Sequence, residues 1–349
     1  MTHLWVRAES RDNEERVGIM PDGVAELIAQ GMRVTVEDSD TRCVPIDHFR
    51  AAGADIAPNG TWVRAPKDAI VFGLKELPDD GSALRHRHIM FGHAYKGQPA
   101  GQRLLARFKA GGGTLYDLEY LENPEGRRVA AFGYWAGYAG AAVSLLAFAA
   151  QDHGTCPPVS TWASSEAMRA DVAAALDGAT PDALVIGALG RVGTGACDLC
   201  EAVGLSVTKW DLTETAHGGP FPEVLNHTLF FNCILARPGT PVFVPADTCS
   251  RDRALRVIGD IACDPDSDFS PIKVYDAATS WTEPVTRVCH APPLDVMAID
   301  NLPSLMPRES SEDFASQLLP HLKTLDSPER GVWGRAKTHF DDHIGKASS

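Results

Sequence analysis

The chain has 349 residues, of which 46 are acidic and 32 basic, so its formal net charge is −14. This length favours two domains, and a composition with 44% hydrophobic and 22% charged residues excludes a disordered or fibrous protein. The excess of acidic residues argues against a general binder of nucleic acids or acidic membranes, because phosphate groups need a surplus of Lys and Arg. We therefore expect anionic substrates to be bound by a few local basic residues.

The N-terminal residues lack a basic region followed by an apolar one, which predicts a cytoplasmic protein without a secretory signal. The segment 129–151 carries no charged side chain and is long enough to cross a bilayer. It is rich in alanine and contains Gly133, Gly137 and Gly140, so it is too weakly apolar for a membrane span. We interpret it as a buried helix that crosses between the two domains.

The eight cysteines are spaced without the paired pattern of a zinc knuckle. In a cytoplasmic chain we expect all of them to be reduced. Cys197 and Cys200 have the spacing C-x-x-C, but the sequence holds no second pair. Packing is therefore favoured over metal binding, and no metal site is expected.

Short β-rich runs alternate with amphipathic stretches along the first third of the chain, as in an α/β layer. Pro21 marks the start of a helix over 21–28. A further series of buried strands begins at residue 183 and indicates a second parallel sheet. An amphipathic helix over 311–325 is expected to pack back on the first domain. The predicted strands are 4–7, 32–37, 69–74 and 88–91 in the first sheet, and 183–186, 206–210, 229–234, 256–261 and 296–299 in the second.

Gly187, Gly190 and Gly193 lie where a predicted buried strand turns into a helix. Glycines there let the backbone approach a pyrophosphate, whose charge faces free N–H groups and the positive end of the helix dipole. The alternative is that they only close a tight turn. Asp211, at the end of the next strand, favours a dinucleotide, because its carboxylate can bind the ribose hydroxyls of adenosine and repels a 2′-phosphate. This favours NAD, although Lys209 leaves NADP open.

Lys75 and His93 follow predicted strands of the first domain, where α/β proteins place reactive groups. A lysine that leaves a buried strand can lose part of its charge by desolvation and act as a base, and a histidine titrates near neutrality. The alternatives are a solvated charge at Lys75 and a structural hydrogen bond at His93. Arg16 and the pair Arg127 and Arg128 can bind carboxylates through bidentate contacts or form surface salt bridges.

Short stretches spread over the chain carry a resemblance to a known family: GLKELP at 73–78, GHAYKGQ at 92–98, GTLYDLEYL at 113–121, GRRVAAFG at 126–133, GALG at 187–190, KWD at 209–211 and IDNLPS at 299–304. They resemble the lysine-forming, NAD-dependent saccharopine dehydrogenases. The resemblance extends from about residue 4 to residue 325 and is most specific around Lys75, His93 and Arg127. The opening RVGIMP at 16–21 is also similar to the wider group of alanine dehydrogenase and the transhydrogenase nucleotide-binding subunit.

The resemblance implies an α/β fold of two Rossmann-like, doubly wound parallel-sheet domains, with the active site in the cleft between them. Residues 1–133 with 303–349 would form the substrate and catalytic domain. Residues 134–302 would form the NAD-binding domain.

The activity that the resemblance implies is the reversible, NAD-dependent oxidative deamination of saccharopine to L-lysine and 2-oxoglutarate. Saccharopine is a secondary amine that joins lysine to a glutaryl unit, and its oxidation at the glutaryl α-carbon leaves an imine. Lys75 would take the proton of the secondary amine, and His93 would act as acid and base for the addition of water and the collapse of the carbinolamine. Glu76 and Glu119 would modulate the pKa values of these two groups.

The resemblance also implies which residues hold the ligands. The substrate-binding residues are Arg16, Lys75, Glu76, Lys96, Gln98, Glu119 and Phe132. The cofactor-binding residues are Arg127, Gly187, Gly190, Arg191, Gly193, Asp211, Thr215, Ile261, Ile299, Asp300, Asn301 and Leu302.

The sequence departs from the fungal members of that family around the cofactor. Those members have a cysteine at the position of Val192, paired with a cysteine of the third nucleotide-binding strand, so Cys233 is left single here and that disulfide cannot form. Leu235 stands where those members have an aromatic residue near the adenine. The ending Lys-Ala-Ser-Ser does not resemble a peroxisomal signal, which leaves the cytoplasmic expectation in place.

Two other functions stay open at this point. The same fold and chemistry can serve another opine-like secondary amine or a simple amino acid such as alanine, since a few carboxylate contacts decide the substrate. A non-catalytic, NAD-binding regulatory protein is the other, and loss of Lys75 or His93 would be its sign, but both residues are present. The expected partners are small molecules, without nucleic acid or membrane, and no oligomeric state is predicted.

Overall fold

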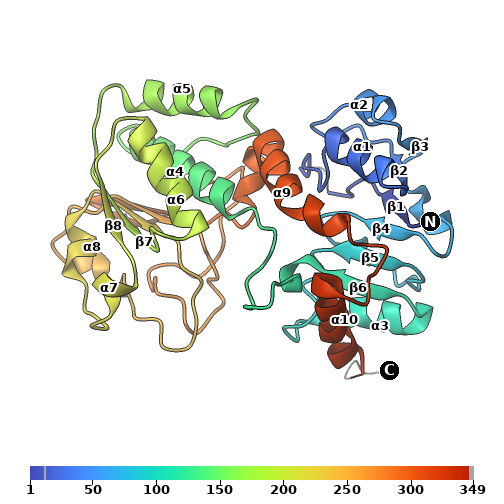
Figure 1. Cartoon of the computed structure of the whole chain (residues 1–349). Coiled ribbons are helices and arrows are strands. Elements are labelled where there is room, and N and C mark those ends of the chain that lie inside the picture. Colours follow the sequence, from blue (N-terminus) through green and yellow to red (C-terminus); the bar gives the residue numbers. More distant parts are fainter. Residues whose placement is uncertain (12, 346–349) are drawn as a thin grey trace. The chain divides into compact units, whose positions relative to one another are not determined.

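A computed structural model describes residues 1–11 and 13–345. The chain forms two compact units (Figure 1), and each contains its own six-stranded sheet. Unit 1 consists of Met1–Ala131 and the chain from Ser310 onward, and unit 2 consists of Phe132–Glu309. The predicted α/β class with two Rossmann-like sheets is confirmed. The function of each unit stays a prediction.

The sheet of unit 1 is parallel throughout, and its strand order is β3-β2-β1-β4-β5-β6. The order reverses between β1 and β4, which is where open α/β sheets bind ligands, beyond the carboxyl ends of the strands. The inner strands are buried on both faces, which explains their runs of Val, Ile and Phe. The strands are β1 (His3–Val6), β2 (Arg33–Glu37), β3 (Asp55–Ala57), β4 (Ile70–Phe72), β5 (Arg87–Met90) and β6 (Thr114–Asp117).

The helices of unit 1 are α1 (Pro21–Ala29), α2 (Ile46–Ala51), α3 (Pro99–Gly111), α10 (Gly331–Ile344) and all but the first three residues of α9 (Pro307–Leu322), with short 3-10 turns η1 (Thr61–Arg64) and η2 (Leu118–Tyr120). As predicted for 311–325, α9 packs on this unit: the ring of Phe314 lies 6.0 Å from that of Phe91. The C-terminal helix α10 was not predicted. It packs on β6 through Trp333, whose ring lies 5.7 Å from that of Tyr116.

The strands of the sheet of unit 2 have the order β11-β12-β10-β9-β7-β8, and this strand order reverses between β7 and β9. The five predicted strands of this sheet pair in parallel, as expected, and β11, an additional edge strand, is antiparallel to β12. Only residues 291 and 292 join these two strands, and a connection that short can only form a hairpin. The strands are β7 (Ala183–Ile186), β8 (Val207–Trp210), β9 (Leu229–Asn232), β10 (Val257–Asp260), β11 (Thr286–His290) and β12 (Pro293–Met297).

The helices of unit 2 are α4 (Gly133–Ala150), α5 (Ser165–Leu176), α6 (Arg191–Ala202), α7 (Leu212–Thr215) and α8 (Pro222–Asn226), with the 3-10 turns η3 (Thr248–Ser250) and η4 (Leu302–Leu305). Among the described residues, α4 alone is long and apolar enough to cross a membrane, but 56% of it is buried within the protein. A Cβ on Gly137 would lie 1.8 Å from the carbonyl oxygen of Val192, and one on Gly195 would lie 1.9 Å from that of Tyr134. Backbone contact between α4 and α6 therefore explains these two glycines, and α4 is a core helix.

One expectation about the cysteines is wrong. Cys249, in η3, and Cys289, in β11, form a disulfide with their Cα atoms 5.6 Å apart. The sequence could not show this pair because only the fold brings η3 beside the edge strand. Cys197, Cys200 and Cys233 are buried free thiols.

Candidate active site

Lys75 lies in the loop that follows β4, at the point where the strand order of unit 1 reverses. The loop of His93 follows β5, and the two loops are joined because the backbone N–H of Phe91 donates to the carbonyl of Leu74 at 2.9 Å. Glu119 follows β6, whose Asp117 is the register partner of Met90 in β5. The parallel sheet thus places all three side chains beyond the carboxyl ends of its strands.

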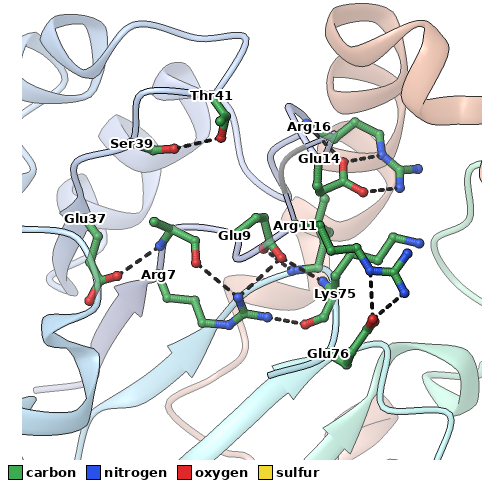
Figure 2. Close-up of polar contacts among 12 residues, drawn as sticks. Arg7, Glu9, Arg11, Glu14, Arg16, Glu37, Ser39, Thr41, Lys75 and Glu76 are labelled. Carbon is green, nitrogen blue, oxygen red and sulfur yellow. Dashed lines mark hydrogen bonds and ion pairs between the residues drawn. The ribbon is translucent and has the colours of Figure 1, made fainter. Parts of the chain in front are cut away.

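The side chain of Lys75 is partly buried and lies among charged groups (Figure 2). Burial lowers the pKa of Lys75 below its ordinary value, and the positive charges of Arg16 and Arg11 lower it further, while Glu14 and Glu76 act in the opposite direction. A lysine with a lowered pKa holds its proton less tightly and can act as a base closer to neutral pH.

Arg16 is 4% exposed and forms a bidentate ion pair with Glu14, with Nε–Oε1 and Nη2–Oε2 distances of 2.7 and 2.6 Å. Burial alone would raise the pKa of Glu14, but the charge and hydrogen bonds of Arg16 outweigh it and hold that pKa below its usual value. Glu76 is likewise paired, since Nε of Arg11 donates to Oε1 of Glu76 at 2.7 Å. Two carboxylates and two guanidinium groups therefore surround the amine of Lys75.

Two residues that the sequence reasoning missed hold this loop from the side of β1. Arg7 and Glu9 follow β1 directly, and both side chains are buried. The carboxylate of Glu9 accepts hydrogen bonds from the N–H groups of Leu74 and Lys75, and the guanidinium of Arg7 donates to the carbonyl of Lys75 (Figure 2). Charged residues directly after a buried strand were the available signal, as they were for Lys75.

A cavity of about 300 Å³ adjoins this cluster within unit 1. The residues that line it include Arg7, Glu9, Arg11, Asp40 and Trp62. The cavity is lined by charges of both signs, as a zwitterionic amino-acid ligand requires.

His93, Lys96 and Glu119 form a second cluster. Nδ1 of His93 and Nζ of Lys96 lie 3.3 and 2.8 Å from the two oxygens of Glu119. These contacts, opposed by burial, lower the pKa of Glu119 to about 2, so its carboxylate is charged at neutral pH. A carboxylate only accepts hydrogen bonds, so Nδ1 carries a proton and Nε2 of the neutral ring is left to accept one.

The backbone also sets the direction of His93. Its φ of 47° is in the left-handed region, which costs energy for a residue with a side chain. Gly101 of α3 packs directly against it, because a Cβ there would lie 2.8 Å from the carbonyl oxygen of His93. The ring of Phe91 stacks on that of His93 at 6.3 Å.

Three predicted residues lie outside these two clusters. Gln98 is the exposed N-cap residue of α3. Arg127 is exposed on a turn that Asn123 closes through its side-chain oxygen. Phe132 belongs to unit 2, where it is the N-cap residue of α4, although it was predicted within the first domain.

The glycine-rich turn of unit 2 connects β7 to α6, where the strand order of the second sheet reverses. Gly187 has a φ of +86°, and a Cβ on Gly193 would lie 2.1 Å from the carbonyl oxygen of Gly187, so both positions require glycine. Gly190 and Arg191 are exposed at the start of α6. A tight turn at a helix N-terminus with an open glycine fits the pyrophosphate of a dinucleotide.

Asp211 follows β8, beside that turn. Its Oδ2 accepts a hydrogen bond from the N–H of Leu189 at 3.1 Å, and it caps α7 through a reciprocal contact with Glu214. Thr215 bonds back to the carbonyl of Asp211 within the same helix. Lys209 forms an ion pair with Glu201 at 2.6 Å.

The other predicted cofactor residues of unit 2 follow the carboxyl ends of β10 and β12, just as the glycine-rich turn follows the carboxyl end of β7. Ile261 and Leu302 are buried and pack against Gly140 of α4. Asp300 is exposed, and the side chain of Asn301 accepts a hydrogen bond from Trp281. Ile299 is buried and forms an isolated bridge with Thr279.

Sequence reasoning also missed a buried polar network at this edge. Asp260 accepts hydrogen bonds from Asn232 at 2.8 Å and from Tyr275 at 2.6 Å. Burial raises the pKa of Asp260, and these two hydrogen bonds lower it in part. The network fixes the ends of β9 and β10, next to the glycine-rich turn.

Residues 5–139 match the family described as alanine dehydrogenase/PNT, N-terminal domain. The chain is 43% identical to the saccharopine dehydrogenase (NAD+, L-lysine-forming) of Candida glabrata, covering 99% of this chain and 97% of that one. It is 41% identical to the protein of the same name from Schizosaccharomyces pombe, covering 99% of both.

Two solved structures share the fold. One is an L-alanine dehydrogenase, with a TM-score of 0.68 and 17% identity over 98% of this chain and 99% of that one. The other is a transhydrogenase from Sinorhizobium meliloti, with a TM-score of 0.66 and 16% identity over 95% of this chain and 97% of that one.

Proposed function

Because the chain belongs to the family of NAD-dependent, lysine-forming saccharopine dehydrogenases, we propose that it converts saccharopine and NAD reversibly to L-lysine, 2-oxoglutarate and NADH. The proposal rests on identity of 41–43% over nearly the whole chain, together with the two charged clusters of unit 1 and the glycine-rich turn of unit 2.

NAD, when bound, supplies the two-electron oxidation of a carbon–nitrogen single bond. The backbone at Gly187, Gly190 and Gly193, with Arg191, would hold its pyrophosphate, and Asp211 would hold the adenosine ribose. Thr215, Ile261 and residues 299–302 would complete the pocket at the same sheet edge. Arg127 is proposed to bind the cofactor as well.

Leu189, Leu212 and Leu235 support a pocket for an apolar ring at this edge. Each is an exposed apolar side chain, and they follow the adjacent strands β7, β8 and β9. Exposed apolar side chains that gather at one place, unlike isolated ones, mark a site for a ligand or partner. A purine ring is a ligand of that kind.

Lys75 would accept the proton of the substrate's secondary amine. Its lowered pKa and its burial among Arg16, Glu14 and Arg11 suit a base that must be neutral when the substrate binds. Arg16, 4% exposed and fixed by Glu14, would pair with a substrate carboxylate, and Glu76, Lys96, Gln98 and Phe132 are proposed to line the substrate.

His93 would give and take the protons needed for water addition and for release of lysine. Glu119 orients its ring and leaves Nε2 able to accept a proton. A half-exposed ring also has access to water, which the hydrolytic step consumes.

The observation that carries the proposal is the position of Lys75, a lysine of lowered pKa at the point where the strand order of the sheet reverses. The test is NADH formation from saccharopine by the wild type and by Lys75→Met. We expect kcat to fall by ~10²–10⁴-fold, the usual contribution of one acid–base group, with NAD affinity unchanged. Lys67→Met, at an exposed lysine of the same unit, is the control.

We also propose a cytoplasmic location, because the chain has the composition of a soluble globular protein and α4, the one described helix apolar enough to cross a membrane, packs in the core of unit 2. Fractionation of the cells that make the protein tests this.

A further inference from the structure

The peptide of Lys75 is held on both sides by side chains from the end of β1. Oε1 and Oε2 of Glu9 accept hydrogen bonds from the N–H groups of Leu74 at 2.6 Å and of Lys75 at 3.0 Å. Nη2 of Arg7 donates to the carbonyl oxygen of Lys75. Both polar groups of the Lys75 backbone are thus bound by side chains, which fixes the direction of its Cα–Cβ bond.

Arg7 and Glu9 are joined to one another and to β4. Nη1 of Arg7 lies 3.3 Å from Oε2 of Glu9, and the side chains are 1% and 8% exposed. The backbone N–H of Arg7 donates to the carbonyl of Phe72 at 2.9 Å. The guanidinium crosses Gly73 so closely that a Cβ there would lie 2.4 Å from its Cζ atom.

A contribution to folding stability does not by itself explain this arrangement. A buried ion pair adds little net stability, because desolvation of both charges offsets their attraction. Three residues in sequence, Gly73, Leu74 and Lys75, instead take their geometry from it. A reacting group must be placed within a fraction of an ångström, and a rigid support is how proteins achieve this.

We propose that Arg7 and Glu9 are positioning residues for catalysis. Their ion pair holds the peptide of Lys75 through hydrogen bonds and so places the Lys75 amine in the charged cluster where the substrate amine is deprotonated. This inference rests on the proposed function for its catalytic meaning. The hydrogen bonds from Arg7 and Glu9 to the Lys75 peptide lie within unit 1, and their effect on the Lys75 amine can be measured without a substrate.

The test combines turnover with direct labelling of Lys75. Trace acetylation by acetic anhydride over a range of pH, followed by peptide mass spectrometry, reports the fraction of neutral amine at each lysine, and exposed Lys67 serves as the internal reference. The variant Glu9→Gln keeps the size of the side chain, but its amide can accept only one of the two N–H groups. A loosened loop admits water and weakens the desolvation of the Lys75 amine, so the pH at which its labelling is half-maximal should rise.

The charged groups that face Lys75 from its own loop and from residues 11–16 are Arg11, Glu14, Arg16 and Glu76. All four are unchanged in Glu9→Gln. With saccharopine as substrate we expect kcat to fall by about 10²-fold, the usual cost of misplacing a reacting group by an ångström, while NAD affinity stays unchanged. Glu9→Asp, which keeps the carboxylate, should recover part of both effects.

Asp295→Asn is the matched control. Asp295 is also a buried carboxylate in an ion pair, but its partners are Arg287 at 2.8 Å and Gln151, and neither belongs to the loop of Lys75 or to residues 7–9. It should lower thermal stability with kcat and the pH of half-maximal labelling of Lys75 unchanged. An equal effect of Glu9→Gln and Asp295→Asn on kcat and labelling would overturn the proposal, as would no effect of Glu9→Gln.

Arg7→Lys keeps the test decisive if Glu9→Gln does not fold. A lysine retains the charge next to Glu9 but lacks the fork that reaches the carbonyl of Lys75 as well. The same shift in labelling is expected, and an unchanged midpoint would contradict the proposal. In one outcome the wild type fails to oxidise saccharopine although the labelling of Lys75 shifts in Glu9→Gln or Arg7→Lys as described. That result would contradict the proposed function but support the positioning of Lys75 by Arg7 and Glu9.

Discussion

Glu119 and His93 come from loops that follow adjacent parallel strands and meet through a hydrogen bond of 3.3 Å between Oε2 and Nδ1. The bond assigns the ring proton to Nδ1 and gives His93 a defined direction of proton transfer. Because Lys96 binds the other oxygen at 2.8 Å, Glu119 also links the two basic side chains of this cluster.

Glu119→Ala should therefore lower kcat through His93. We expect a loss of at least tenfold, but a smaller one than the ~10²–10⁴-fold loss from removing the acid–base group itself in His93→Gln. Steady-state kinetics of the two variants checks the order. Glu125→Ala, at an exposed glutamate of the neighbouring turn, is the control and should behave as wild type. Equal activity of the Glu119 and Glu125 variants would contradict the role of Glu119.

The pH dependence of turnover should report Lys75. Only a neutral amine accepts a proton, so kcat/KM for saccharopine should rise with pH, with a midpoint below the ordinary lysine value of 10.5. The charge of Glu14 raises the pKa of Lys75, so Glu14→Gln should move this midpoint to lower pH. Asp22→Asn, at an exposed site on α1, should leave it in place. A midpoint that rises in Glu14→Gln would refute the electrostatic assignment.

Asp211→Ala should weaken NAD binding by about 10- to 100-fold, since a hydrogen bond to a charged group contributes roughly 1.5–3 kcal/mol. Titration of the protein with NAD, followed by calorimetry, measures this. Asp211 also caps α7, so Glu214→Ala, which breaks the same capping box and keeps the Asp211 carboxylate, separates the two effects. Comparable losses in both variants would show that α7, rather than the carboxylate, matters for NAD.

The disulfide between Cys249 and Cys289 should stabilise unit 2. Closing a loop with a sequence separation of 40 residues restricts the unfolded chain, which corresponds to roughly 2–4 kcal/mol. A reducing agent should lower the Tm of the wild type and leave that of the double variant Cys249→Ser, Cys289→Ser unchanged. The same Tm for oxidised and reduced wild type would show that the bond adds no stability.

The sequence predicted the central strands because they are buried on both faces and form continuous apolar runs, as in β7 and β4. It missed β3, β6 and β11, which all lie at sheet edges; β3 has only three residues, and β11 is half exposed. Short edge strands bury little apolar surface, so their pattern resembles that of a loop.

For the candidate site, the sequence singles out Lys75 and His93 as candidates because each follows a buried strand and belongs to a stretch that resembles the family. Arg7 and Glu9 also follow a buried strand, but their contact with Lys75 depends on β1 lying beside β4, far along the chain. The disulfide and the network around Asp260 depend on sheet order in the same way. Contacts between distant segments are decided by topology, which a local pattern does not contain.

The central claim is that this protein oxidises saccharopine with NAD. The most direct measurement is NADH formation by the purified protein with saccharopine, L-alanine, L-lysine or no substrate, and with NADP in place of NAD. We predict turnover with saccharopine and NAD, and loss of that turnover in Lys75→Met. Turnover of L-alanine but not of saccharopine, or NAD binding without turnover of any amine, would contradict it.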